Sequence, residues 1–178
     1  MKTTMTRIAT IAIVTATLFS TAYAGDNIRV YFSPNGHAGD AFTQRMNAAT
    51  TSIDIVTYSI SQIDITTAIL AAHQRGVQVR LVVDKGQEAL NYSTAPMLAA
   101  AGVPTLTDNH HALQHNKYAI IDGHTVATGS YNYTDNAERR NAENLIIIDD
   151  EETATAYAAD FDTHWNHARP YRPRTLPK

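Results

Sequence analysis

Two short strand-like runs, joined through an Asp-Gly pair, constrain the fold of this chain more than any other feature. The runs are Lys117–Ile121 and Thr125–Thr128, and the three residues between them begin with Asp122-Gly123. Asp-Gly is a favoured sequence for a tight hairpin turn, because both residues tolerate the positive φ that the turn needs. The segment therefore predicts two adjacent antiparallel strands.

Four polar residues flank this strand pair at a regular spacing. His115 and Lys117 are separated by one residue, and so are Ser130 and Asn132. Side chains alternate faces along a strand, so the members of each pair point the same way. The two strands are thus expected to bring an imidazole, an ammonium, a hydroxyl and an amide to one point, a set suited to a phosphodiester.

Strand-like and helix-like segments alternate along the rest of the chain. The nearly continuous apolar run Val77–Val83 is typical of a strand buried on both faces. This alternation predicts an α/β fold, an α-β-α sandwich whose mixed β-sheet is covered by helices on both faces. The other expected strands are Ile28–Phe32, Ser52–Ile60, Val103–Leu106 and Asn144–Asp149. The expected helices are Asp40–Ala49, Asp64 to about His73, Ala95–Ala101 and Glu151–His167.

Residues 1–24 are typical of a secretory signal peptide. Lys2 and Arg7 give a positive start, Ile8–Phe19 an apolar stretch, and Ala22-Tyr23-Ala24 an A-x-A cleavage site. The apolar stretch is interrupted by threonines and is short for a membrane span, which disfavours the alternative of an anchor. We expect cleavage near Ala24 and a periplasmic or secreted protein without stable membrane association. One domain is expected over 25–168, followed by a basic Pro/Arg-rich tail over 169–178.

Composition narrows the chemistry further. The chain has no cysteine, which excludes thiolate nucleophiles, iron–sulfur clusters and cysteine-ligated zinc. Its formal net charge is −3, and −5 without Lys2 and Arg7, although nucleic-acid binders usually carry a basic patch. We expect a locally positive cleft on an acidic body; the alternative is that the basic tail is a solvated terminus. The basic residues outside the first segment include Arg139, Arg140, Arg169, Arg172, Arg174 and Lys178.

The spacing from His115 onward resembles the phospholipase D superfamily. That family carries HxKxxxxD, then Gly-Ser-x-Asn, then an acidic residue. The resemblance extends upstream through Ser52–Ile60 and Gly76–Lys85, and it is strongest to the short exported bacterial endonucleases with one such motif per chain. It implies the same α-β-α fold and no cofactor. The site residues it implies are His115, Lys117, Asp122, Ser130, Asn132 and Glu143.

A single motif per chain implies a dimer. A histidine nucleophile at phosphorus needs a second group to protonate the leaving oxygen. The family supplies two motifs per active site, yet this chain contains no second His-x-Lys. The resemblance therefore implies a homodimer with C2 symmetry. His115 would attack phosphorus, while the partner subunit's His115 protonates the leaving alcohol and then activates water.

Charge suggests the remaining roles. Lys117 and Asn132 would hold the phosphate oxygens, with Ser130 as a further donor. Glu143 is expected to accept a hydrogen bond from the far ring nitrogen of His115, although it could be a solvated residue before a strand. Asp122 is expected to act as turn former and motif member together.

Several alternatives remain open at this point. The favoured substrate is DNA, or RNA, cleaved without a metal. A phospholipase D acting on lipid head groups would use the same chemistry, and a non-catalytic periplasmic binding protein is a third possibility. A metal site built from His111 and His115 with Asp108 nearby lacks a convincing third ligand.

Overall fold

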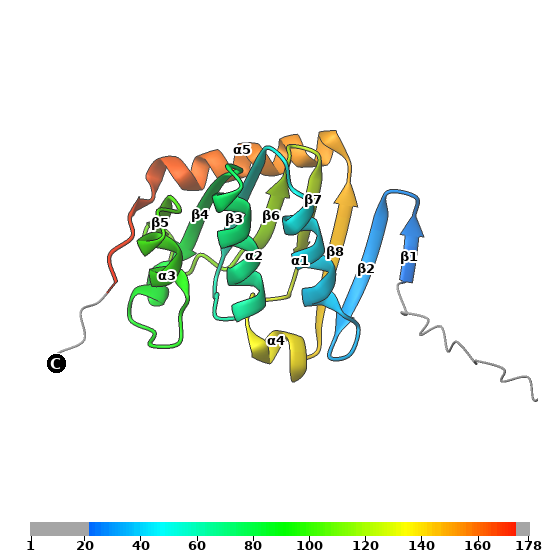
Figure 1. The fold of residues 1–178 in the computed structure, drawn as a ribbon, viewed down its shortest axis with the longest axis horizontal. Helices are drawn as coiled ribbons and strands as arrows, with labels where there is room; N and C mark the ends of the chain where they lie inside the picture. Colours follow the sequence, from blue (N-terminus) through cyan, green and yellow to red (C-terminus); the bar gives the residue numbers. More distant parts are fainter. Residues whose placement is uncertain (1–21, 174–178) are drawn as a thin grey trace, which may run out of the picture.

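A mixed sheet of nine strands forms the centre of the computed structural model, which describes residues 22–173 (Figure 1). The strands are β1 (Ala22–Gly25), β2 (Ile28–Ser33), β3 (Ser52–Thr57), β4 (Gln78–Asp84), β5 (Thr105–Asp108), β6 (Lys117–Ile121), β7 (Thr125–Gly129), β8 (Glu143–Asp149) and β9 (Arg169–Pro170). Their order in the sheet is β1-β2-β8-β7-β6-β3-β4-β5-β9. The pairs β3–β4 and β4–β5 are parallel, and the other neighbours are antiparallel.

Helices cover both faces of the sheet. On one face lie α1 (Ala38–Ala48), α2 (Ile63–Gln74) and α3 (Ala95–Ala100), and on the other lies α5 (Glu151–His167) (Figure 1). Along β6, Ala119 and Ile121 belong to the core under α1 and α2, whereas Tyr118 and Ile120 belong to the core under α5. This alternation buries both faces of the strand. The predicted α-β-α sandwich is confirmed.

The predicted hairpin is also confirmed. β6 and β7 pair antiparallel from Ile121↔Thr125 to Tyr118↔Thr128. The turn residues Asp122 and Gly123 have φ values of 54° and 64°. Positive φ at both central positions is what a tight turn between twisted strands requires.

Some boundaries differ from those expected. β3 ends at Thr57 rather than Ile60, because the chain then leaves the sheet and Ile60 forms an isolated bridge with Tyr133. The strand expected at Val103–Leu106 is shifted to Thr105–Asp108. Two short helices, η1 (Lys85–Glu88) and α4 (Asp135–Arg139), were not predicted, and neither were β1 and β9.

The C-terminal boundary predicted at residue 168 falls inside the folded domain. Arg169 and Pro170 form β9 against β5, and Arg169 pairs with Glu88 at 2.6 Å. The tail therefore begins later than expected, and the described part of it is fixed on the edge of the sheet. Arg169, occupied by Glu88, is not available as a free phosphate-binding cation.

The predicted signal peptide lies mostly outside the described residues, which begin at 22. The expected cleavage site at Ala22–Ala24 falls within β1, which pairs antiparallel with β2. Cleavage after Ala24 would leave β2 as the edge of the sheet. Within residues 22–173, no helix combines the length and apolar character needed to cross a bilayer.

Candidate active site

The ends of three neighbouring interior strands lie side by side and carry most of the predicted site. β6 begins at Lys117, β7 ends at Gly129 and β8 begins at Glu143. These three strands are neighbours and pair antiparallel in the order β8-β7-β6. An antiparallel arrangement places the start of one strand beside the end of the next. The fold thus brings His115, Lys117, Ser130 and Glu143 together at the same end of these strands.

His115 and Lys117 share a neighbour that the sequence did not reveal. The ring of Tyr58 lies against the His115 imidazole, with centroids 4.7 Å apart, and the Lys117 Nζ lies 5.2 Å from the centre of the same ring. Tyr58 comes directly after β3, where the backbone N–H of Tyr58 donates to the carbonyl of Asn116. The sequence placed Tyr58 inside the strand expected at Ser52–Ile60 and gave no signal of this contact.

Lys117 is a buried cation beside an exposed imidazole. Its side chain is largely enclosed, with the residue 7% exposed, and its Nζ donates to the carbonyl oxygen of His115. Burial lowers the pKa of Lys117, while the nearby Glu143 carboxylate acts in the opposite direction. A poorly hydrated ammonium gains more from an incoming anion than one in bulk water. His115 itself is exposed to solvent.

Glu143 and Ser130 form a pair, which differs from the expected arrangement. The Ser130 hydroxyl donates to Glu143 Oε2 at 2.6 Å and accepts from the backbone N–H of Asn144 at 3.1 Å. Asn141 Nδ2 donates to Glu143 Oε1 at 2.9 Å. Among the described residues of one chain, the predicted hydrogen bond from His115 to Glu143 is not formed. Ser130 instead orients Glu143.

Asn132 lies two residues after Ser130 and is half-buried. Its Oδ1 is enclosed and makes no hydrogen bond to any part of the chain that the structure describes. An enclosed oxygen without a partner is costly. Nδ2 of the same amide is not enclosed in this way, so its N–H groups can reach a phosphate oxygen.

Gly129 allows β7 and β8 to approach closely at the site. Its φ is 150°, and a Cβ at this position would lie 2.2 Å from the backbone oxygen of Asn144. No side chain fits in that space. The Gly-Ser pair of the motif therefore sets the separation of the strands as well as supplying a hydroxyl.

Asp122 lies at the opposite end of β6 from Lys117, and the structure does not bring it to the cluster. Its carboxylate accepts hydrogen bonds from the backbone N–H groups of Thr50, Thr51 and Ser52. Partial burial opposes ionisation, but these N–H donors outweigh it and lower the pKa of Asp122 to about 2. Asp122 thus holds the hairpin turn to the start of β3, which fits the turn-forming part of its expected role.

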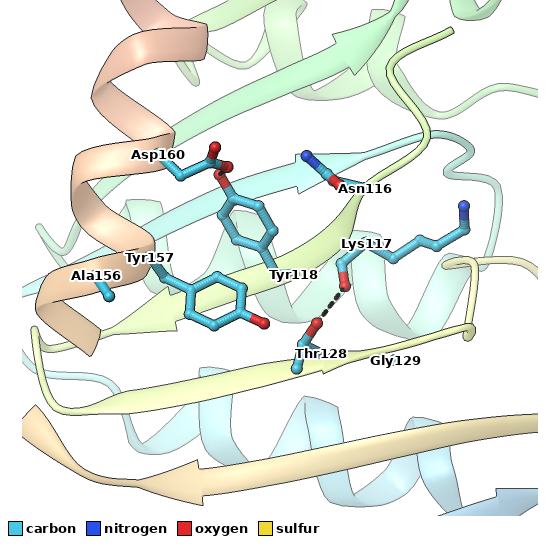
Figure 2. A pocket seen from close by; sticks show the side chains of 8 residues that line it. All are labelled: Asn116, Lys117, Tyr118, Thr128, Gly129, Ala156, Tyr157 and Asp160. Carbon is cyan, nitrogen blue, oxygen red and sulfur yellow. Dashed lines mark hydrogen bonds between the residues drawn. The ribbon is translucent and has the colours of Figure 1, made fainter. Parts of the chain in front are cut away.

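A pocket of about 380 Å³ lies beside the cluster, between α5 and the strands β6 and β7 (Figure 2). Tyr118 donates to Asp160 at 2.7 Å within it, and Thr128 donates to the carbonyl oxygen of Lys117 at 3.2 Å. Figure 2 shows the ammonium of Lys117 extending away from the tyrosines of the pocket. The pocket adjoins the cluster rather than containing it.

Comparison with known proteins gives the family. A family model described as "Cardiolipin synthase, PLD-like domain" matches residues 42–165, which include every motif residue identified above. The chain belongs to the phospholipase D-like family. Phospholipase D of Rickettsia prowazekii is 36% identical over 131 residues, covering 74% of this chain and 64% of that protein. Human mitochondrial cardiolipin hydrolase is 35% identical over 123 residues, covering 69% of this chain and 49% of that protein.

A solved structure supports both family and fold. Nuc from Salmonella typhimurium, described as a phospholipase D family member, is 36% identical with a TM-score of 0.78, covering 82% of this chain and 97% of that chain. NucT from Helicobacter pylori shares the fold at 23% identity and a TM-score of 0.75, covering 81% of this chain and 98% of that chain. The chain thus spans nearly the whole of these two, but less than two thirds of the curated relatives above.

Proposed function

We propose that this chain is a phosphodiesterase that cleaves DNA through a covalent intermediate on His115. The observation that supports this proposal most strongly is the exposed His115 imidazole beside the enclosed Lys117 side chain, where β6 begins. An accessible nucleophile and a preorganised cation are the two groups that attack on phosphorus requires. In a phospholipase D-like chain they occupy the His and Lys positions of the family motif.

The proposed reaction has two displacements. A ring nitrogen of His115 forms a bond to phosphorus as the bond to the leaving oxygen breaks, and that oxygen takes a proton from the partner subunit's His115. The imidazole that gave up this proton is now neutral and accepts a proton from water. The resulting hydroxide attacks phosphorus and breaks the phosphorus–nitrogen bond. Lys117 and Asn132 bind the non-bridging oxygens throughout and offset the charge that develops on them.

Two exposed apolar side chains support a dimer formed around the site. Phe32 is 56% exposed and lies opposite Asn144 in the β2–β8 register, next to Glu143. Leu113 is 54% exposed and lies two residues before His115. Large apolar side chains beside an incomplete catalytic set suit a subunit interface. The missing second His-x-Lys is the chemical reason that a partner is needed.

The choice of DNA rests on the likeness to Nuc over 97% of that chain, together with the motif's resemblance to short exported endonucleases. RNA is a second substrate for the same chemistry. The names of the curated relatives, a phospholipase D and a cardiolipin hydrolase, favour a lipid as the other candidate. Export to the periplasm or beyond is predicted from the pattern of the first 24 residues and stays a prediction.

One assay separates these substrates. Purified protein is incubated with supercoiled plasmid, single-stranded RNA, and vesicles of phosphatidylcholine with cardiolipin, each in excess EDTA at 25 °C, with circular dichroism recording that the fold persists. We expect nicking of plasmid and no release of head groups, with His115→Ala inactive on all three. Head-group release without plasmid cleavage would favour the lipid. No turnover of any substrate by folded protein would contradict the proposed activity.

A further inference from the structure

Three histidines gather around one carboxylate oxygen at the end of β5. Asp108 Oδ2 lies 2.9 Å from His111 Nδ1, 3.2 Å from His164 Nδ1 and 3.2 Å from His167 Nε2. The four side chains come from the end of β5, the loop that follows it and the last turn of α5. One nitrogen or oxygen from each residue lies within 4.8 Å of all the others.

The number of nitrogens around this oxygen exceeds what hydrogen bonding explains. Gln114 Nε2 also donates to Asp108 Oδ2, at 2.9 Å, which makes four nitrogens around one atom. A carboxylate oxygen has two lone pairs for strong acceptance. Convergence of several imidazoles and a carboxylate on one point is the arrangement of metal ligands.

We propose that Asp108, His111, His164 and His167 bind one zinc ion. Zinc prefers four ligands in a tetrahedron, with bonds to imidazole nitrogen and carboxylate oxygen of about 2.0–2.2 Å, so that ligand atoms lie about 3.3–3.5 Å apart. The three oxygen–nitrogen separations of 2.9–3.2 Å need to open by only a few tenths of an ångström. The nitrogens must close from as far as 4.8 Å, which rotation of the partly exposed His111 and His167 allows.

The surroundings already support such an ion. The backbone N–H groups of His110 and His111 donate to Asp108 Oδ1 and fix the plane of the carboxylate. Backbone donors of this kind orient a carboxylate that binds a metal.

The proposed zinc site lies next to the loop that carries His115. Gln114 and Asn116 flank His115, and both contact His164: Gln114 Nε2 lies 2.8 Å from its Nδ1 and Asn116 Nδ2 lies 3.3 Å from its Nε2. Four protein ligands leave no open position for water or substrate, which marks a structural rather than a catalytic zinc site. The site is therefore independent of the proposed reaction, and His115 is not among its ligands. The pairing of His111 with His115 suggested by the sequence is replaced by His164 and His167.

Metal binding is measured directly, without reference to activity. Full-length protein free of any histidine tag is stripped with EDTA, dialysed and titrated with zinc against a chromophoric chelator, and bound metal is counted by mass spectrometry. We expect one zinc per chain. Zinc at about 100 times its dissociation constant should raise Tm by about 5–10 °C. Cobalt(II) in place of zinc should give the intense visible bands of a tetrahedral site.

Variants locate the site. His111→Ala and His167→Ala remove partly exposed ligands, so both are expected to fold, and each should weaken zinc binding at least about 100-fold. His110→Ala is the matched control, because its ring packs on His167 with centroids 4.8 Å apart but it is not in the ligand set. Unchanged zinc affinity in both ligand variants, or no saturable binding by the unaltered chain, would overturn the proposal. Plasmid cleavage by the stripped, folded protein is a separate readout that tests the proposed function.

Discussion

The imidazole of His115 lies against the ring of Tyr58, with centroids 4.7 Å apart and planes inclined by 54°. Lys117 approaches the same ring with its ammonium. Tyr58 is therefore placed to hold the proposed nucleophile and the proposed phosphate-binding cation at a fixed separation. Its contacts with both are made by the ring.

Removing this ring should slow the reaction without disrupting the fold. We expect Tyr58→Ala to lower kcat about 10-fold with a smaller change in KM, because misplacement of reacting groups raises the barrier. Tyr58→Phe keeps the ring and should restore most of the rate. Steady-state kinetics on plasmid or a dinucleotide substrate measures both. An equal loss in the two variants would show that the hydroxyl, not the ring, matters.

His115→Ala should abolish turnover while leaving structure intact. The imidazole is exposed, so its removal leaves no cavity in either core. Loss of a nucleophile with no substitute is expected to lower kcat by at least about 10³-fold. His124→Ala, at the far turn between β6 and β7, is the control and should keep the native rate. Near-native activity of His115→Ala would exclude it as the nucleophile.

Asp122→Asn should affect stability rather than catalysis. The pKa of Asp122 is about 2 in the fold and about 3.9 in an unfolded chain. A lowered carboxyl pKa stabilises the fold above about pH 4, and that contribution disappears as the pH falls towards 2. The variant should lose about 1–2 kcal/mol at pH 7, and Tm should fall by several degrees.

The pH profile provides the internal check on Asp122. The gap in Tm between the unaltered chain and Asp122→Asn should narrow between pH 4 and pH 2, because over this range the carboxyl binds a proton in the unfolded chain before it does so in the fold. The kcat of the variant should remain within about twofold of the native value, since the motif cluster lies at the other end of β6. A large loss of kcat at full folding would return Asp122 to the active site.

Gly129→Ala should separate β7 from β8 at the site. The added methyl would meet the Asn144 carbonyl oxygen at 2.2 Å. We expect the free energy of unfolding to fall by about 2–4 kcal/mol and most activity to be lost. The reason is that Ser130 follows Gly129 directly and Glu143 precedes Asn144. Gly123→Ala is the matched control: its φ is also positive, at 64°, but its Cβ would meet nothing within 4 Å. It should cost only about 1–2 kcal/mol. Equal costs for the two would contradict the close approach.

The elements that depend on neighbouring residues alone could be predicted from the sequence. The Asp122-Gly123 turn and the run of Val77–Val83 depend on backbone preference and burial, which a short window of sequence records. The α-β-α sandwich, and the position of His115 and Lys117 at the end of a strand, follow from this turn and this strand.

Features that depend on distant contacts were not predictable in this way. β9 exists because Arg169 reaches Glu88, 81 residues earlier in the chain. The cluster on Asp108 draws His164 and His167 from a helix more than fifty residues further along. The fixed spacing of the motif placed Asp122 with the catalytic group, whereas strand direction carries it to the opposite end of β6.

The central claim is that two copies of His115 act on one phosphorus, one as nucleophile and one as acid. Its most direct test is to quench protein of known oligomeric state during turnover in alkali, where phosphohistidine survives, and to count adducts by mass spectrometry. The account predicts a dimer carrying a phosphoryl adduct on His115 in one of every two chains. A fully active monomer, or an adduct on every chain or on another residue, would contradict it.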